Sequence, residues 1–320
     1  MNKWTLLAVG AFSICVPFIF TNEYYFSIII MACIWAIITV SLNLIVGYTG
    51  QISIAHGAFF GIGAYTSGLL VLKLKLSFWL ALPMSGIVAM IFGLLVGYPT
   101  LRLKGAYFAI ASMCFGLVIN VIITHWIDLT RGTMGLPGIP APNPIPLPGI
   151  GSLTFDSMTA KYYLILAFLY LTIFVMHRIV NSRIGRSFIA ISQDEVLAES
   201  IGVYLMRYKV LSFGISAFFA GLGGSLYSIF FGFISPEVSS LDISFNALVL
   251  VIVGGAGTMV GPILGTFFLV VLPEALQVLK ELRLVIFGLI LVLTIIYLPT
   301  GMFPGIQSLW RKLLGSGKER

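Results

Sequence analysis

Polar and glycine residues are concentrated between Asn43 and Gly57, in a part of the chain that is otherwise apolar. The polar side chains there that could bind a substrate or transfer a proton belong to Asn43, Gln51, Ser53 and His56. Amide, hydroxyl and imidazole groups are costly to bury against hydrocarbon unless they find hydrogen-bond partners. We therefore expect these side chains to face the interior of a helical bundle or a watery cavity. There they would line a transport pathway or a gate between two half-helices.

These polar residues also have a purely structural interpretation. Asn, Ser and Gly hold membrane helices together at their contacts, and this role stays open beside the pathway role for Asn43 and Ser53. For His56, a structural hydrogen bond explains the residue better than a titrating role. A metal site is not expected, since the other two histidines, His125 and His177, lie far from His56 in the sequence.

The glycines that follow indicate close packing of helices. Gly57 and Gly61 form a small-xxx-small surface of the kind that lets two membrane helices approach each other. Tyr65, at the end of the same stretch, is a further candidate for the pathway lining. Neither residues 61–63 nor the glycine run at 254–257 is expected to bind a nucleotide, since no strand precedes them and no Walker lysine follows. We therefore expect no ATP site and no other cofactor.

The apolar segments also lack the residue motifs that are typical of catalytic sites. The apolar segments contain no His-Glu-x-x-His motif, no Gly-x-Ser-x-Gly motif and no pair of carboxylates. Glu274, after Pro273, is the main acidic residue near membrane depth. Since carriers driven by protons or sodium often have buried carboxylates, this pattern disfavours a self-powered carrier as well as an enzyme.

The elements that must position these residues are membrane helices. The 320 residues are 59% hydrophobic and 9% charged, with a mean hydropathy of +1.07, whereas soluble domains contain about 25% charged residues. A helix needs about 20 mainly apolar residues to cross a hydrocarbon core roughly 30 Å thick. The apolar runs are long and continuous, which predicts an all-α polytopic bundle and excludes a β-barrel. The runs cover residues 26–46, 53–72, 78–99, 106–124, 162–176, 210–235, 243–272 and 284–299.

The number of spans depends on how one further run and one glycine stretch are interpreted. Residues 5–20 are interpreted as a retained first helix rather than a signal peptide, because no small-residue cleavage pattern follows them. Splitting residues 243–272 at the glycines 254–257, with a new helix from about Gly261, gives about ten spans (eight to ten) and two cytoplasmic termini. Twelve of the 18 basic residues then lie inside, in agreement with the positive-inside rule. A re-entrant helix pair at this point is the alternative.

Two polar stretches connect the spans within what we interpret as a single transmembrane domain, residues 1–320. Residues 126–160, placed outside, contain six prolines and predict an extended, stiff loop. Residues 181–209, placed inside, predict short amphipathic helices on the cytoplasmic face. Their acidic residues Asp194, Glu195 and Glu199 disfavour binding to anionic lipid, so docking on a partner protein is the favoured interpretation.

Six motifs occur in the same order as in a known family. They lie at residues 43–53, 56–65, 102–110, 130–140, 185–202 and 254–262. Together they resemble the LivM-type permease subunit of branched-chain amino acid ABC importers, from about Asn43 to Gly305. The resemblance implies a type II ABC importer-like permease in the bacterial plasma (inner) membrane.

The resemblance also implies a set of partners. LivM-type subunits pair with a homologous LivH-type permease, two cytoplasmic ATPase subunits supply the energy, and an extracytoplasmic amino-acid-binding protein delivers the substrate. The lipid bilayer is the remaining partner, and no nucleic acid is expected. The energy source would then lie outside the chain, in agreement with its lack of a nucleotide site.

Site residues follow from the same resemblance. The family's cytoplasmic coupling loop corresponds to residues 194–202, and its external glycine-rich segment to residues 130–140. Ser200 stands where the family often has Ala, and Met134 stands where relatives are frequently polar or acidic, which leaves the substrate open. The external segment is expected to act through Thr130, Gly132, Thr133 and Gly135, and the ATPase coupling through Arg183, Gly185, Arg186, Asp194, Glu195, Ala198, Glu199 and Gly202.

The leading hypothesis is a permease subunit of an ATP-driven importer for branched-chain or related hydrophobic amino acids. Motion of residues 183–202 would tilt the helices around residues 43–56 and alternate access to a pathway with few specific contacts. Related subunits serve urea and short amides, which is one alternative. A self-contained secondary carrier or channel is the alternative from a different class. Exchanging Glu195 and Glu199 for Arg is expected to abolish ATPase association without preventing membrane insertion.

Overall fold

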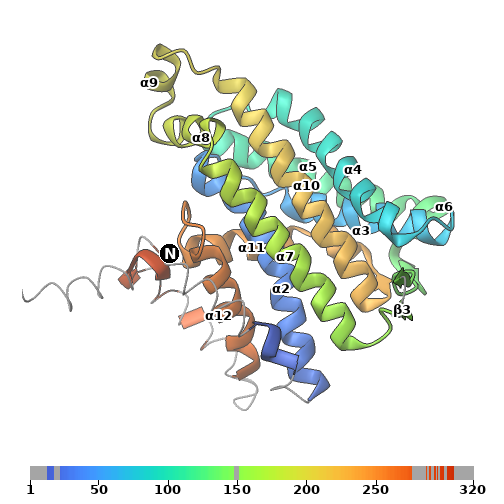
Figure 1. The fold of residues 1–320 in the computed structure, drawn as a ribbon. Helices are drawn as coiled ribbons and strands as arrows, with labels where there is room; N and C mark the ends of the chain where they lie inside the picture. The colour runs from blue at the N-terminus through green and yellow to red at the C-terminus, as the bar shows by residue number, and fades with distance from the viewer. Residues whose placement is uncertain are drawn as a thin grey trace, which may run out of the picture.

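The computed structural model describes residues 13–17, 22–147, 151–275 and 301–305, with single residues between 286 and 298. Helices dominate this part of the chain (Figure 1). The longer helices are α2 (Glu23–Asn43), α3 (His56–Leu72), α4 (Phe78–Thr100), α5 (Ala106–His125), α7 (Met158–Val180), α10 (Leu205–Phe231), α11 (Leu241–Gly254) and α12 (Gly261–Ala275). The shorter ones are the π-helix η1 (Leu44–Tyr48), α6 (Ile127–Thr130), α8 (Arg183–Gln193), α9 (Glu195–Ser200) and the 3-10 turns η2 (Gly132–Met134) and η3 (Pro236–Ser239).

Five helical segments of the described chain are long and apolar enough to cross a membrane. They are α2 with its extension η1, α4, α5, α7 and α10, while the apolar helices α3, α11 and α12 are shorter. The predicted all-α membrane bundle is confirmed at this level. The predicted spans at residues 5–20 and 284–299 lie largely outside the described residues, so ten spans and cytoplasmic termini stay predictions.

The predicted break between residues 243 and 272 is present. α11 ends at Gly254 and α12 begins at Gly261. The backbone between them passes through Gly255 and Gly257 at φ +117° and +77°, conformations that favour glycine. The two helices have 14 and 15 residues, hence lengths of about 21–23 Å, which is less than the roughly 30 Å of the hydrocarbon core. Two short helices joined by a glycine turn fit both the split and the re-entrant alternative.

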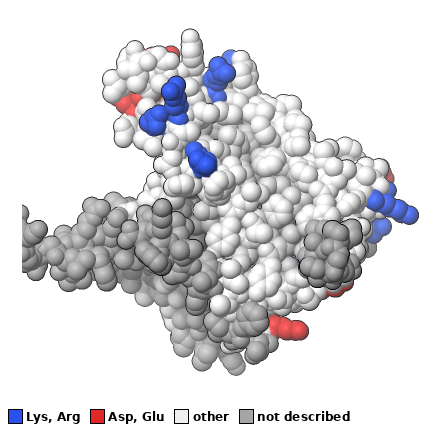
Figure 2. Space-filling view, in the orientation of Figure 1, with Lys and Arg blue, Asp and Glu red and all other residues white. Residues whose placement is uncertain are grey.

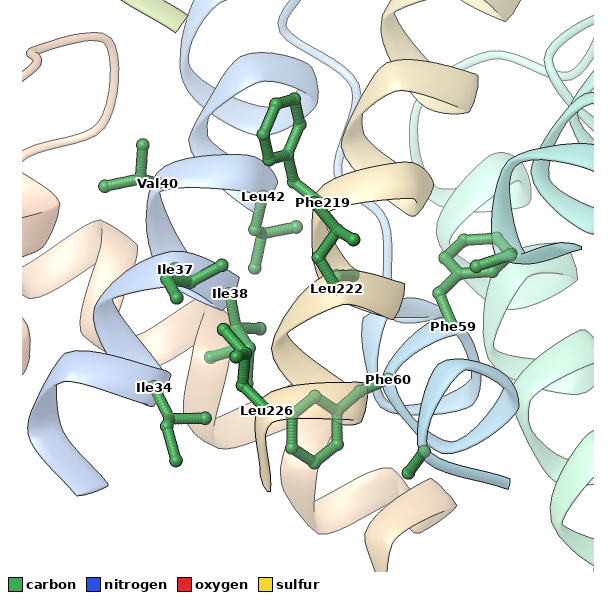
Figure 3. Packing of buried hydrophobic residues seen from close by; sticks show 14 of the residues in the cluster. Ile34, Ile37, Ile38, Val40, Leu42, Phe59, Phe60, Phe219, Leu222 and Leu226 are labelled. Atoms are coloured by element: carbon green, nitrogen blue, oxygen red, sulfur yellow. The ribbon is translucent and has the colours of Figure 1, made fainter. Parts of the chain in front are cut away.

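The centre of the bundle is formed by α2, α3 and α10. Figure 3 shows Ile38 and Leu42 of α2 facing Leu222 and Leu226 of α10, with Phe60 of α3 beside them. Most residues of α2 and α10 are buried, whereas α4, α5 and α7 bury a much smaller share. The three outer helices therefore present broad apolar faces, as expected for helices that contact lipid or another subunit.

Glycine on α3 permits the close approach of its neighbours. A Cβ atom on Gly63 would lie 2.1 Å from the carbonyl oxygen of Gly221, so α3 and α10 touch backbone to backbone. Cβ atoms on Gly57 and Gly61 would lie 2.5 Å from Ser240 O and 2.4 Å from Ser239 Cβ, at the end of η3. The small-residue surface predicted on α3 is thus a packing surface, as expected.

Residues 126–160 are more folded than the extended loop that their prolines predict. They contain α6, η2 and three short strands: β1 (Leu136–Pro137), β2 (Ile145–Leu147) and β3 (Gly151–Leu153). β1 pairs antiparallel with β4 (Phe233–Ile234) beyond α10, and β2 pairs with β3. Positive φ angles at Arg131, Gly132 and Gly135 reverse the chain and return it to the bundle.

Charged side chains gather at two ends of the molecule (Figure 2). One group lies over α8 and α9, another lies at the opposite end near α6, and the surface between them is largely uncharged (Figures 1 and 2). This distribution is the one expected of a protein whose middle lies in a bilayer, because charged side chains are costly at membrane depth.

Candidate functional site

Beyond the end of α2, an irregular segment extends to α8 and then returns to the bundle. The helix widens into η1, a π-helix of the kind that often marks a functional site. The chain then turns at Gly50 (φ +74°), where a Cβ atom would lie 3.1 Å from the Cα of Ser192 in α8. It re-enters the bundle, and α3 begins at His56. Residues 44–55, named the 44–55 turn below, therefore connect the bundle interior with α8.

Asn43 holds the 44–55 turn against the loop between α11 and α12. Its Nδ2 donates to the carbonyl oxygen of Thr258 at 2.8 Å, and its Oδ1 accepts from the N–H of Gly257 at 2.9 Å. A Cβ atom on Gly47 would lie 2.2 Å from the same Gly257 nitrogen. Both ends of the amide are therefore used to join two glycine-containing turns, as the structural interpretation of Asn43 requires.

His56 lies deep inside the bundle. Its Nε2 is 2.7 Å from the hydroxyl of Ser216, which donates its proton to Ser41 O at 2.5 Å. Ser216 is halfway along α10, about 17 Å from the start of that helix at 1.5 Å per residue. Because the Ser216 proton is used, Nε2 of His56 must be the donor, and Nδ1 is buried with no hydrogen-bond partner among the described residues. The structural hydrogen bond expected for His56 is present.

The five residues predicted to line a pathway are all buried within the chain. Asn43, Gln51, Ser53, His56 and Tyr65 have exposed fractions of 7% or less. Ser53 accepts a hydrogen bond from the N–H of the residue two positions later, and the Tyr65 hydroxyl has no partner among the described residues. Pathway lining stays a prediction for all five.

The predicted cytoplasmic helices are α8 and α9. Ser182 caps α8 by accepting from the N–H of Gly185 at 3.3 Å. Asp194 caps α9 by accepting from two backbone N–H groups at 2.8 and 3.1 Å, which explains why an acidic residue precedes this helix. Gly202, at φ +87°, ends the segment. The short helices expected within residues 181–209 are present.

The coupling residues inferred from the family divide into a buried and an exposed set. Gly185 and Ala198 are buried, and a Cβ atom on Gly185 would lie 2.1 Å from Val180 O of α7, so this glycine allows α8 to pack on α7. Arg183, Arg186, Asp194, Glu199 and Gly202 are exposed. Beside them lie four exposed apolar side chains, Val196 (72% exposed), Leu197 (63%), Ile201 (69%) and Tyr204 (77%), which we call the α9 surface.

Glu195 belongs to neither set, because its carboxylate faces the bundle. Its Oε1 is 2.5 Å from Nζ of Lys209 and accepts a hydrogen bond from Nε2 of Gln51 at 3.1 Å. Lys209 lies in the first turns of α10 and is only 3% exposed. Sequence reasoning missed the role of this lysine. A cation directly before the apolar run at 210–235 was the available signal, since a cation that becomes buried requires an acidic partner nearby.

The external segment inferred from the family forms a tight turn on β4. The Thr130 hydroxyl donates to backbone oxygens of α5 and the turn after it at 2.6 and 2.7 Å. Gly132 and Gly135 are buried at positive φ, and a Cβ atom on Gly135 would lie 2.1 Å from Ile234 O. Thr133 is exposed. Three of the four predicted residues therefore shape the turn, and Thr133 is presented on its surface.

Comparisons with known proteins agree with the resemblance to permease subunits. A family model described as a branched-chain amino acid transport system permease component matches residues 24–295. The high-affinity branched-chain amino acid transport system permease protein LivM of Salmonella typhimurium is 32% identical over 95% of this chain and 75% of its own length. LivM of Escherichia coli K12 is 31% identical over the same shares. The permease protein LivH of Salmonella typhimurium is 26% identical over 89% of this chain and 96% of its own. No solved structure matches the chain.

Proposed function

This chain belongs to the family of branched-chain amino acid transport permeases, and we propose that it forms part of the membrane pathway of an ATP-driven importer. The resemblance to LivM-type permeases is confirmed by matches that cover 95% of the chain. The chain is accordingly a permease component of a high-affinity branched-chain amino acid ABC transport system, a transport subunit and not an enzyme. Its individual partners, its pathway and its orientation are the content of the proposal.

The proposed partners are a homologous LivH-type permease, two cytoplasmic ATPase subunits and an extracytoplasmic amino-acid-binding protein. The similarity of this chain to LivH over 89% of its length supports the first of these, because two homologous subunits can pack about a common axis. The little-buried faces of α4, α5 and α7 supply the apolar area that such packing needs.

The observation that carries the coupling role is the α9 surface. Four large apolar side chains stand exposed on α9 and the short connection to α10, and the exposed Glu199 lies in the same segment. Amphipathic helices of this kind dock into grooves on partner proteins. An interfacial helix on anionic lipid is the competing possibility, and the acidic residues Asp194 and Glu199 disfavour it. The α9 surface is therefore the proposed contact with an ATPase subunit.

The end of the molecule that holds α8 and α9 is proposed to be cytoplasmic. Basic residues are more numerous there, as the positive-inside rule requires. In the described chain the residues at this end are Arg102, Lys104, Arg178, Arg183, Arg186, Arg207 and Lys209, against Lys73, Lys75, Arg131 and Lys161 at the opposite end. The external turn at residues 130–140 would then face the binding protein.

Branched-chain amino acids are the proposed cargo. The five predicted pathway residues include no charged side chain, which suits a neutral zwitterion with an apolar side group delivered by a protein that supplies the affinity. Uptake assays with the complete complex in proteoliposomes test this assignment. Leucine, isoleucine and valine should be taken up, and urea and acetamide should not. Uptake of urea in preference to leucine would refute the proposed cargo.

A further inference from the structure

The ion pair between Glu195 and Lys209 joins the cytoplasmic segment to the bundle. It is the only ion pair in the part of the chain that the structure describes. Glu195 is the first residue of α9, Lys209 belongs to α10, and Gln51, which donates to the same carboxylate oxygen, belongs to the 44–55 turn. One oxygen atom therefore holds together the successive helices α9 and α10 and the 44–55 turn, whose Gln51 lies 144 positions from Glu195 in the sequence.

The burial of Lys209 makes this contact different from an ordinary surface pair. Exposed ion pairs exchange readily with water, whereas a buried ammonium that loses its partner is left uncompensated. Lys209 is 3% exposed, and the side chain of Glu195 is 22% exposed. Asp194 caps the N-terminus of α9 directly beside Glu195, so the backbone that carries this carboxylate belongs to the helix. A displacement of α9 larger than the Glu195 side chain can absorb by rotation must therefore either carry Lys209 and Gln51 along or break the contact.

The 44–55 turn connects the Glu195–Lys209–Gln51 contact with other elements of the bundle. The N–H of Gln51 donates to Ile45 O in η1 at 2.9 Å, so movement of Gln51 bears directly on the π-helix. η1 follows Asn43, whose amide holds the loop between α11 and α12. The other end of the turn leads to His56 at the start of α3. Hydrogen bonds together with the backbone of the turn thus connect α9 with the start of α3 and with the α11–α12 loop.

We propose that Glu195, Lys209 and Gln51 are positioning residues that transmit displacement of α8 and α9 to the 44–55 turn. This inference rests on the proposed function, in which an ATPase subunit moves α8 and α9. It also separates the two acidic residues that sequence reasoning treated alike. Glu199 faces outward and belongs to the docking surface, whereas Glu195 faces inward and belongs to the transmission.

The test is the ratio of leucine transported to ATP hydrolysed by the complete complex in proteoliposomes. The variants are Glu195→Gln and Lys209→Met, which keep shape and remove one charge, and the exchange Glu195→Lys with Lys209→Glu. Gln51→Met removes a hydrogen bond and leaves the ion pair intact, so it reports on transmission even where a charge variant fails to fold. Asp156→Asn, an exposed carboxylate at the opposite end of the molecule, is the control.

Each variant complex is expected to contain its ATPase subunits and to hydrolyse ATP. The leucine-to-ATP ratio should fall about tenfold in the two single-charge variants and severalfold in Gln51→Met, as expected for the usual coupling between sites. The charge exchange should restore most of the ratio, and Asp156→Asn should leave it unchanged. A merely structural role would lower the yield of complex and leave the ratio unchanged.

Two results would overturn the inference. One is an unchanged ratio in Gln51→Met and in the single-charge variants. The other is loss of the ATPase subunits from Glu195→Gln without recovery in the charge exchange, which would place Glu195 in the ATPase contact. Both presuppose that the unaltered complex transports leucine with ATP. If the unaltered complex shows no such uptake, the proposed function itself is refuted.

Discussion

Replacing Asn43 with Leu removes a clamp between two turns and keeps a side chain of similar size. The substitution deletes both hydrogen bonds of the amide, those to Thr258 O and from Gly257 N, at 2.8 and 2.9 Å. It also leaves a partly buried carbonyl and a partly buried N–H without their partner. We therefore expect the complex to be less stable, with the α11–α12 loop as the first region to open.

The size of the effect follows from the number and setting of these bonds. A hydrogen bond in a protein contributes about 1 kcal/mol net, and helix-to-helix bonds in membrane proteins average about 0.6 kcal/mol. Two bonds at a partly buried site therefore contribute about 1–3 kcal/mol. At about 2–4 °C per kcal/mol, the factor for domains of about 150–250 residues, the apparent unfolding midpoint should fall by about 2–12 °C.

The measurement is thermal unfolding of the purified complex in detergent, followed by loss of a monodisperse peak on size-exclusion chromatography. Asn246→Leu is the matched control, because it makes the same chemical change at an exposed position on α11. The control should unfold within about 1 °C of the unaltered chain, as surface substitutions usually do. If Asn43→Leu has the same unfolding midpoint as the control and changes only the apparent affinity for substrate, Asn43 lines the pathway. The proposed stabilising role of its two hydrogen bonds is then refuted.

Three other substitutions test separate parts of the account. Gly63→Ala places a Cβ atom 2.1 Å from Gly221 O and should destabilise the complex by about 1–3 kcal/mol in the same unfolding assay, and an unchanged midpoint would contradict the backbone contact of α3 and α10. Leu197→Glu puts a charge on the α9 surface and should weaken ATPase binding at least about tenfold in a pull-down titration, with normal insertion and unfolding, whereas normal binding would place the docking surface elsewhere. Gly135→Ala combines a positive φ with a clash against Ile234 O. It should reduce the uptake stimulated by binding protein and leave basal ATP hydrolysis intact, while equal loss of both would assign the turn a general stabilising role.

Much of the fold was predictable because it depends on local composition. Continuous apolar runs and the glycines around Gly254 determine where helices can form and where they must break. The caps of α8 and α9 also follow from short-range chemistry, since Ser182 and Asp194 accept from N–H groups two or three residues away. The family resemblance then predicted which segment couples to the ATPase, without any knowledge of its contacts.

The site itself was less predictable because its contacts join distant parts of the sequence. Asn43 meets Gly257 across 214 positions, and Gln51 meets Glu195 across 144. No periodicity encodes such pairs. The orientation of Glu195 is a case in point, since it and Glu199 are one helical turn apart and differ only in what lies next to them. Only the fold shows that one faces Lys209 and the other faces outward.

The central proposal is that this chain forms the transport pathway while separate ATPase subunits supply the energy. Leucine accumulation in proteoliposomes tests it most directly. The complex is reconstituted with and without its ATPase subunits, ATP is enclosed or supplied on the ATPase side, and binding protein with labelled leucine is added on the other. The account predicts accumulation above the external concentration only when ATPase subunits and ATP are both present. Accumulation of leucine by this chain without ATPase subunits, driven by a proton or sodium gradient, would contradict it.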